Sequence, residues 1–471
     1  MSSATLWVQA INAVALIAFT GSPRAPEYPL AGLGIVAFMF VHAFLPACRI
    51  RVGTPVCPIN IAQGYYWIQF VLVTVLVGYF GFSQGSLPYL PSKGAIDLAI
   101  VAHVVGYLSF SVAYQCLAPV PVRRPLLRES TASMAYLVVP FALVGLLGFF
   151  LMHGSVAGFI EYASSPMEER LRAAEATTIQ GAAGTFLKHF LGFAVVLAWS
   201  CWLAAAPRRK LSIIAATAGV VVLLLIANFH YNRGSMLGPI LALVGAFSAH
   251  VWRIPFKVLI PAGALALAIA FAFGSYRSTY LNVTDPSRPA VEDPWSVEDT
   301  VEFVQLYASA PQMSAYVIDS LEGKLYYGAT LLPSLVYPIP VLGKPYRETS
   351  GPVIFNTLIY GEDSDSHDQI IPLDGELYVN FDLAGVVLGS VLLGCVLVWL
   401  QNKFMAAPNP VESYTWLIMA LWTVFPGSLA ITSQIYVYSF WPIYSYFAAK
   451  RLWSWASATA FHRDQAAMKY S

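Results

Sequence analysis

Charged residues are scarce in this sequence, and their scarcity excludes whole classes of protein. Only 11% of its 471 residues are charged, while 58% are hydrophobic and the mean hydropathy is +0.64. Soluble domains carry about 25% charged and about 45–50% apolar residues, so neither a soluble enzyme nor a disordered chain fits. An outer-membrane barrel is excluded as well, because its alternating strands average out as polar. The 26 basic and 25 acidic residues nearly balance, which leaves no overall field to attract nucleic acid.

Cysteine is rare, and the common cofactor motifs are missing. None of the five cysteines lies in a segment that we place on the outer side below, so no structural disulfide is expected there. The sequence has no zinc-ligand spacing, no Walker loop and no GxGxxG motif, and we expect neither a metal nor a cofactor. It also lacks a clear internal repeat, whereas many transporter folds are built from internal repeats.

Long hydrophobic runs are what the sequence has instead. A membrane-spanning helix needs about 20 mostly apolar residues, and twelve segments qualify. We therefore predict an all-α, polytopic membrane protein with about 12 transmembrane helices. The segments lie at roughly 5–21, 29–47, 62–82, 95–117, 132–152, 187–206, 211–229, 235–252, 257–274, 383–401, 414–432 and 434–452.

The basic residues between these segments predict the orientation. Cytoplasmic loops carry an excess of Lys and Arg. One set of alternate loops, together with the C-terminal tail, holds 15 of them, whereas the other set of short loops holds only Arg24, Lys93 and Arg233. This bias predicts that both termini are cytoplasmic.

Two longer segments then fall on the outer side. Residues 1–274 would hold spans one to nine and a small outer loop at 153–186, residues 275–382 one large outer loop, and residues 383–471 the last three spans and a cytoplasmic tail. The large loop contains sixteen of the acidic residues, and long loops are often functional.

Parts of both outer loops have helical patterns. In the large loop, periodicity and end signals predict helices over 296–308 and 311–321, and in the small loop a capping pattern predicts a helix from Ser165. Residues 325–345 are apolar but broken by prolines, so we expect them to dip into the outer leaflet or to cover a cavity.

Three arginines on the outer side are candidates for anion binding. Arg233 lies in a very short outer turn and Arg277 lies just past span nine, while Arg347 lies in the large loop. Together they would form a cationic pocket at the outer leaflet, because arginine binds phosphate with two parallel hydrogen bonds. The alternative for Arg233 is an interaction with lipid headgroups, and the alternative for the other two is pairing with acidic loop residues.

Two residues are candidates for a general base. His367 is the only histidine in the large loop, and the nearby Asp365 and Asp368 would raise its basicity. Glu376 is its competitor, since it would lie near the outer interface and face the arginines, where it would either orient them or act as the base itself. The alternative for His367 is a solvated surface histidine. His230 is a secondary candidate, whereas His42 and His103 are expected to be satisfied interior or interface residues.

The second half of the chain resembles the bacterial oligosaccharide repeat-unit (O-antigen) polymerases. The likeness rests on GELYVNFDLAGV at 375–386, which opens the span after the large loop, on NRGS at 232–235 and on PVLGKP at 340–345. It is concentrated between about residues 225 and 400, and the layout of the spans and loops extends it over most of the chain.

The resemblance implies an enzyme of the bacterial inner membrane. Members of this family join oligosaccharide units carried on undecaprenyl pyrophosphate at the periplasmic face, alongside membrane lipids and polysaccharide assembly proteins such as a chain-length regulator. The related O-antigen ligases use outer-face arginines for the pyrophosphate and a loop histidine as base, without metal. By position, Arg233 and Arg277 match those arginines and His367 matches the base, although the acidic run around His367 departs from the ligase pattern.

Three other functions compete with a polymerase. A flippase for lipid-linked oligosaccharides would line a path with charged or polar groups inside its spans, whereas every Lys and Arg falls in a loop or at a span end, and Asp97 is the only acid clearly within a span. A non-catalytic scaffold of an envelope assembly is the second competitor, and an O-antigen ligase is the third.

Overall fold

The computed structural model is helical throughout the part of the chain that it describes. Helix makes up 82% of the structure, and the described residues form no strand. The described residues are 3–51, 53–84, 87–117, 131–164, 179–205, 209–228, 233–259, 261, 263, 297–308, 310–321, 323–336, 338–339, 342–346, 348–361, 371–424 and 428–470. They fall into two compact units, here called unit 1 (1–125, 244–407 and 412–434) and unit 2 (126–243, 408–411 and 435–471).

The first half of unit 1 contains the N-terminal helices. They are α1 (Ser3–Thr20), α2 (Gly32–Phe44), α3 (Pro58–Trp67), α4 (Val73–Phe80) and α5 (Lys93–Cys116), with short 3-10 turns at Pro29–Ala31 and Pro46–Cys48. A π-helical segment at Ile68–Leu72 joins α3 to α4, so Pro58–Phe80 forms one span. Ser92 caps α5, because its Oγ accepts a hydrogen bond from the backbone N–H of Ala95.

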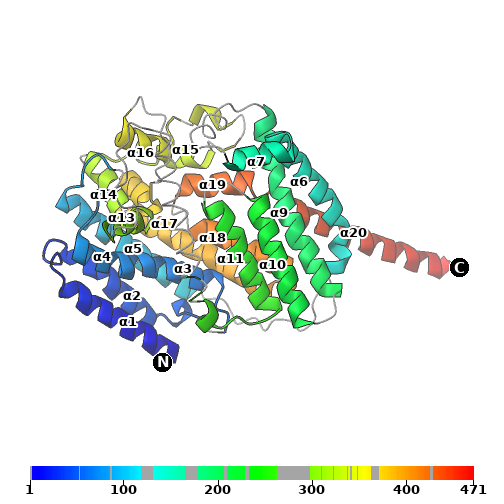
Figure 1. Ribbon diagram of the computed structural model, residues 1–471, viewed down its shortest axis with the longest axis horizontal. Coiled ribbons are helices and arrows are strands. Elements are labelled where there is room, and N and C mark those ends of the chain that lie inside the picture. Colours follow the sequence, from blue (N-terminus) through cyan, green and yellow to red (C-terminus); the bar gives the residue numbers. More distant parts are fainter. Residues whose placement is uncertain are drawn as a thin grey trace. The chain divides into compact units, whose positions relative to one another are not determined.

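The second half of unit 1 contains helices between residues 297 and 434, although residues 408–411 belong to unit 2 and the last helix named here continues into unit 2 from residue 435. They are α13 (Val297–Ala308), α14 (Ala310–Ser320), α15 (Leu331–Val336), a 3-10 turn at Lys344–Tyr346, α16 (Gly351–Tyr360), α17 (Leu373–Ala406), α18 (Pro410–Val424) and α19 (Leu429–Tyr438). Figure 1 shows α5 and α17 side by side, with α14 next to both.

Glycines allow α5 and α17 to approach closely. A methyl group at Gly394 of α17 would come within 2.8 Å of the Phe110 carbonyl oxygen, and one at Gly106 of α5 would come within 3.0 Å of Asp374 Oδ1. Small residues at a helix crossing are typical of membrane proteins, because packing rather than hydrophobic burial holds their helices together.

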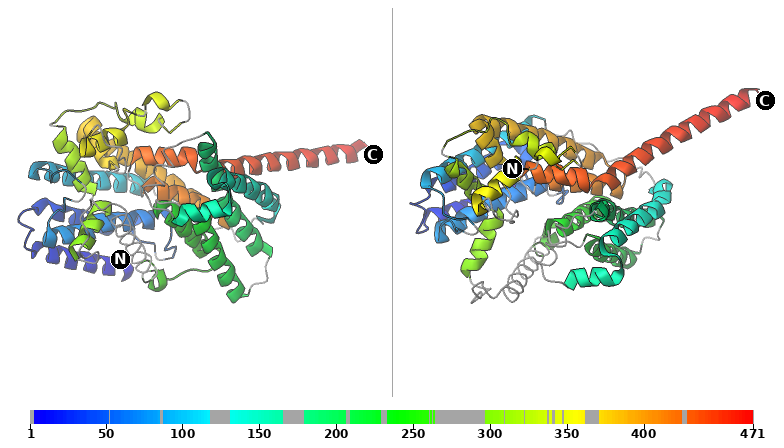
Figure 2. Two further views of the ribbon diagram at one scale, coloured as in Figure 1. Left: turned by 45° about the horizontal axis from the view of Figure 1, so that its top comes forward. Right: turned by 90° about the horizontal axis from the view of Figure 1, so that it is seen from above.

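Unit 2 is built around three helices that run side by side (Figure 2). They are α6 (Val138–His153), α9 (Ile179–Ala205) and α10 (Lys210–Ala227). α7 (Val156–Ser164) follows α6, and α20 (Trp441–Tyr470) packs on α9. α11 (Arg233–His250) begins in unit 2 and ends in unit 1.

The observed helices are apolar, as the predicted spans require, but several of them differ from the prediction in length or continuity. Among the described residues, six helices are long and apolar enough to cross a membrane, namely Pro58–Phe80, Lys93–Cys116, Met134–His153, Ala183–Ala205, Lys210–Ala227 and Leu373–Ala406. Thr5–Thr20, Pro29–Phe44 and Leu237–His250 are apolar but shorter. The segment expected at 434–452 is interrupted between α19 and α20, and most of 257–274 lies outside the described residues.

The loops also agree in part. The helices expected at 296–308 and 311–321 correspond to α13 and α14. The helix expected from Ser165 lies outside the described residues.

Span ten also differs from the prediction, because α17 begins at Leu373 rather than at 383. Asp374 and Glu376 therefore belong to a long apolar helix, so Asp97 is not the only acid inside a span.

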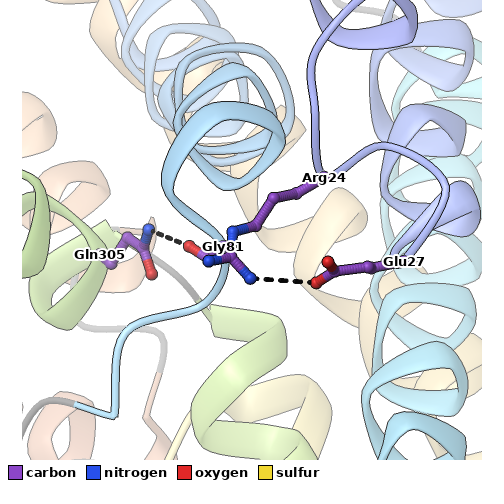
Figure 3. Close-up of polar contacts among 4 residues, drawn as sticks. All are labelled: Arg24, Glu27, Gly81 and Gln305. Atoms are coloured by element: carbon purple, nitrogen blue, oxygen red, sulfur yellow. Dashed lines mark hydrogen bonds and ion pairs between the residues drawn. The ribbon is translucent and has the colours of Figure 1, made fainter.

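A polar contact joins α13 to the loop that follows α4, and the loop after α1 lies beside the same place (Figure 3). Gln305 of α13 donates a hydrogen bond to the Gly81 carbonyl oxygen (2.8 Å) and accepts one from the backbone N–H of Ser83 (2.7 Å). Gly81 has a positive φ of 79°, which favours glycine, and Arg24 lies against it and pairs with Glu27 (3.2 Å).

α14 contacts the same loop. Asp319 accepts hydrogen bonds from the Ser92 hydroxyl (2.6 Å) and from its backbone N–H (3.0 Å), and Gln312 donates to the Ser83 carbonyl oxygen. Residues 21–28, 81–84 and 87–92 and the helices α13 and α14 thus lie at one end of unit 1.

Candidate functional site

Most of the residues that the sequence singled out lie outside the described residues. These are His230, Arg277, Arg347, Asp365, His367 and Asp368. Arg233 is the first residue of α11, and only its backbone is described. Glu376 is the exception, and the structure shows its surroundings in full.

Glu376 lies in a helix that is broken shortly after it. Phe381 and Asp382 have non-helical backbone angles within α17, and Asp382 has a φ of 57°. Besides Asp382, Tyr327 is the only non-glycine residue with positive φ in the described part of the chain. Such conformations cost about 1–3 kcal/mol each and gather at functional sites. The break lies between the polar N-terminal residues of α17 and the apolar remainder of the helix.

A segment of the large loop satisfies the backbone groups that the break leaves unpaired. Tyr326 and Tyr327 donate backbone hydrogen bonds to the carbonyl oxygens of Val379 (2.9 Å) and Asn380 (3.0 Å). The backbone N–H of Gly328 donates to Asn380 Oδ1 (2.9 Å). Burial raises the pKa of the Tyr326 phenol, which therefore stays neutral. Residues 326–328 thus cover the broken part of α17.

The Glu376 carboxyl group is fully buried and receives two hydroxyl groups at one of its oxygens. Ser334 donates to Oε1 at 2.7 Å and Thr330 donates to the same oxygen at 3.3 Å. Each hydroxyl is in turn oriented by a donor, since the Gly351 N–H donates to Ser334 Oγ (3.1 Å) and Asn380 Nδ2 donates to Thr330 Oγ1 (2.7 Å). All four hydrogen bonds therefore run towards Glu376.

The second carboxyl oxygen of Glu376 has no partner. Oε2 is buried and makes no hydrogen bond with the described residues. A buried polar atom without a partner costs about 1–3 kcal/mol, and more if it is charged. A charged Oε2 requires a donor, and a protonated Oε2 requires an acceptor. Either form leaves a place for a hydroxyl group or a water molecule.

A second buried polar group lies beside the same helix. His103 of α5 contacts Asp374 of α17 through Nδ1 and Oδ2 at 2.5 Å, and its Nε2 contacts Gln69 Oε1 at 3.0 Å. The side chains of His103 and Asp374 are 6% and 14% exposed, so a histidine and a carboxylate meet almost out of contact with solvent.

Sequence reasoning found only part of this arrangement. It predicted that His103 would be interior and satisfied, and the hydrogen bonds of both ring nitrogens confirm this. It gave no role to Asp374 or Gln69. The signal that could have found them is the polarity of both residues within apolar segments, since polar groups inside a span are costly and are usually functional.

Comparison of the chain with family models, with curated protein sequences and with solved structures found no match.

Proposed function

We propose that this protein is a membrane glycosyltransferase that joins oligosaccharide repeat units carried on undecaprenyl pyrophosphate at the outer face of a bacterial inner membrane. The observation that supports it best is the buried Glu376 carboxyl group, which has one oxygen held by two hydroxyl groups and the other free. A general base needs this combination of a fixed position and a free acceptor atom.

Glu376 is the first residue to test as the base, because its surroundings are described, while His367, which lies outside the described residues, stays the second candidate. Glu376 is fully buried, and the broken helix and the segment that covers it fix its position. In the proposed reaction, Oε2 takes the proton of the acceptor sugar hydroxyl while that oxygen attacks the donor sugar. The bond from the donor sugar to the pyrophosphate breaks, and Arg233, Arg277 and Arg347 stabilise the negative charge of the leaving pyrophosphate.

The arrangement of unit 1 supports the proposed topology of twelve spans with cytoplasmic termini. The loop after α4, which the charge bias places outside, contacts α13 and α14 from the large loop, and Arg24 of the loop after α1, which the charge bias also places outside, lies against Gly81 of that loop. All of these segments would then face the periplasm, as a loop that handles lipid-linked sugars requires.

The deciding experiment uses purified protein in lipid nanodiscs with lipid-linked repeat units and no nucleotide. Wild-type protein should produce longer glycans, and Glu376→Gln should reduce turnover by roughly 10²–10⁴-fold, because glutamine cannot take up the proton. Asp97→Asn is the matched control, since it also removes a carboxylate with a buried, unpartnered oxygen in unit 1. Failure of the wild type to extend any acceptor would contradict the polymerase function, and full activity of Glu376→Gln would move the base elsewhere.

A flippase remains the second candidate, and one observation favours it. Gln63, Gln69 and His103 are buried polar side chains inside apolar helices, as a transport path requires. Reconstituted protein that moves lipid-linked units across the bilayer without lengthening them would support the flippase and exclude the polymerase. An O-antigen ligase would instead transfer the units to a lipid acceptor in the same assay.

A further inference from the structure

Lys188 is the one charged side chain in the two spans of unit 2 that α6 and α9 contribute. Neither Met134–His153 nor Ala183–Ala205 contains another Lys, Arg, Asp or Glu. The sequence predicted a span from 187 and thus placed Lys188 at its edge, whereas α9 begins at Ile179 and its apolar span begins at Ala183. Lys188 therefore lies more than one helical turn inside the span. Charged residues in such positions are costly and are usually functional.

The charge of Lys188 is not balanced by an acid in the described part of the chain. The helices α6, α9 and α10 contain no Asp or Glu. Glu161 of the neighbouring α7 is exposed, and it forms no ion pair with Lys188. Lys188 itself is half-buried, and a cation that has lost part of its hydration is costly without a counter-charge. This leaves a place for a negative charge beside Lys188.

His153 is a second basic group at this place. It is the last residue of α6, and it lies close enough to Lys188 for the two groups to repel each other when the imidazole is charged. The rings of Phe149 and Phe159 pack against the imidazole at centroid distances of 5.0 and 5.2 Å. Two basic side chains from two helices thus meet beside aromatic rings, and an anion between them would stabilise both.

Close helix packing fixes the backbone of this place. A methyl group at Gly148 of α6 would overlap the backbone of Lys188, and one at Gly184 of α9 would come within 2.6 Å of the Met152 side chain. The two helices therefore touch at Lys188 and one turn before it. A side chain on a fixed backbone loses less freedom when it binds a ligand, which favours a specific site over loose contact with lipid headgroups.

The lipid-facing surface of α6 leads to the same place. Leu143, Leu147 and Phe150 are large apolar side chains that are exposed on α6, and their helical spacing puts them on one stripe. In a membrane such a stripe lies against lipid chains. Phe150 stands about one turn before His153, so a lipid chain along the stripe would bring its headgroup to the end of α6.

We propose that Lys188, with His153 beside it, binds the phosphate group of a membrane lipid where α6 ends against α9. The phosphate oxygens would accept charge-assisted hydrogen bonds from the ammonium group and from an imidazole N–H. Two kinds of lipid offer this group, namely an ordinary anionic phospholipid and the polyprenyl pyrophosphate of the proposed donor. The inference stands on unit 2 alone and does not need the proposed glycosyltransferase activity.

The first experiment measures lipid binding to purified full-length protein by native mass spectrometry in a maltoside detergent, which contains no phosphate. The probes are phosphatidylglycerol and undecaprenyl pyrophosphate, and the controls are diacylglycerol and undecaprenol, which have the same chains without phosphate. At least one probe should bind roughly tenfold tighter than its control, or more, because the phosphate forms hydrogen bonds with a charged group. Lys188→Met should abolish this difference, and Lys188→Arg should retain most of it.

Two further variants complete this experiment. Lys93→Met is the matched control, because Lys93 is an exposed lysine at the start of α5, and its loss should leave the affinity unchanged. His153→Phe keeps an aromatic ring against Phe149 and should weaken binding by a smaller factor than Lys188→Met. The probe whose binding depends on Lys188 identifies the source of the phosphate: phosphatidylglycerol would indicate a phospholipid site, and undecaprenyl pyrophosphate a donor site.

The second experiment observes Lys188 in wild-type protein and so does not depend on the folding of Lys188→Met. In protein labelled with ¹³C at lysine Cε, the NMR signal that Lys188→Arg removes should move when an equimolar amount of the bound probe is added, while the Lys93 signal should stay in place. Equal binding of both probes by wild-type protein and Lys188→Met, a loss of binding in Lys93→Met as large as that in Lys188→Met, or a Lys188 signal that responds equally to the phosphate-free controls would each overturn the proposal.

Discussion

At the scale of single residues, the Glu376 carboxyl group depends on hydroxyl groups from a separate part of the chain. Ser334→Ala would remove one donor to Oε1 and leave the Gly351 N–H without its acceptor. We expect a loss of about 1–3 kcal/mol in the free energy of unfolding, since both groups stay buried. Ser454→Ala is the control, because that exposed hydroxyl bonds only within its own helix. Thermal unfolding in detergent measures the stability of both variants, and the midpoint of Ser334→Ala should be the lower one. Equal midpoints would contradict the importance of the Ser334 hydroxyl.

The sequence revealed the types of residue in this site but not their partners. Glu376 could be predicted as a candidate because it stands at the start of a span after an acidic loop. Its hydroxyl donors could not, since Ser334 and Thr330 are separated from it by 42 and 46 positions. The contact between His103 and Asp374 spans 271 positions, and a single sequence carries no local signal for such a pairing.

At the scale of helices, the sequence located long apolar segments better than it located their ends. Span ten was expected from 383, because Asp374, Glu376 and Asp382 lower the hydropathy of the preceding residues. α17 nevertheless begins at Leu373, since Asp374 has a partner from α5 and Oε1 of Glu376 has partners from residues 330–334. The break at 381–382 was equally hidden, because the residues that stabilise it, 326–328, come from outside the helix.

The close packing of α6 on α9 gives a prediction that belongs to this scale. A methyl group at Gly148 would overlap the backbone of Leu187 and Lys188, so Gly148→Ala should destabilise the protein by about 1–3 kcal/mol through overpacking. Gly219→Ala on α10 is the matched control: a methyl group there meets no atom within 4 Å. Its better helix propensity should stabilise the protein by up to about 1 kcal/mol. If both variants shift the unfolding midpoint in the same direction, the close approach of α6 and α9 is wrong.

At the scale of the whole molecule, composition was sufficient to predict a helical membrane protein, and six helices of spanning length confirm that class. The number of spans is a finer question. Hydropathy counts every apolar run, whereas in the structure some of the predicted runs form helices of only 10–17 residues, such as Thr5–Thr20 and Pro29–Phe44. The alternation of basic residues therefore remains the main argument for twelve spans, and only a labelling experiment can test it.

That experiment follows from the contacts at one end of unit 1. Glu27 and Thr349 are exposed and lie outside the helices, and Arg209 is exposed at the start of α10. In a background without the native cysteines, Glu27→Cys and Thr349→Cys should react with a membrane-impermeant thiol reagent on intact cells, because the charge bias places both outside. Arg209→Cys should react only after the membrane is opened. The reverse pattern would invert the orientation and place Glu376 at the cytoplasmic end, where the periplasmic polymerisation proposed here could not occur. Labelling of Glu27→Cys without Thr349→Cys would break the shared outer end and with it the twelve-span arrangement.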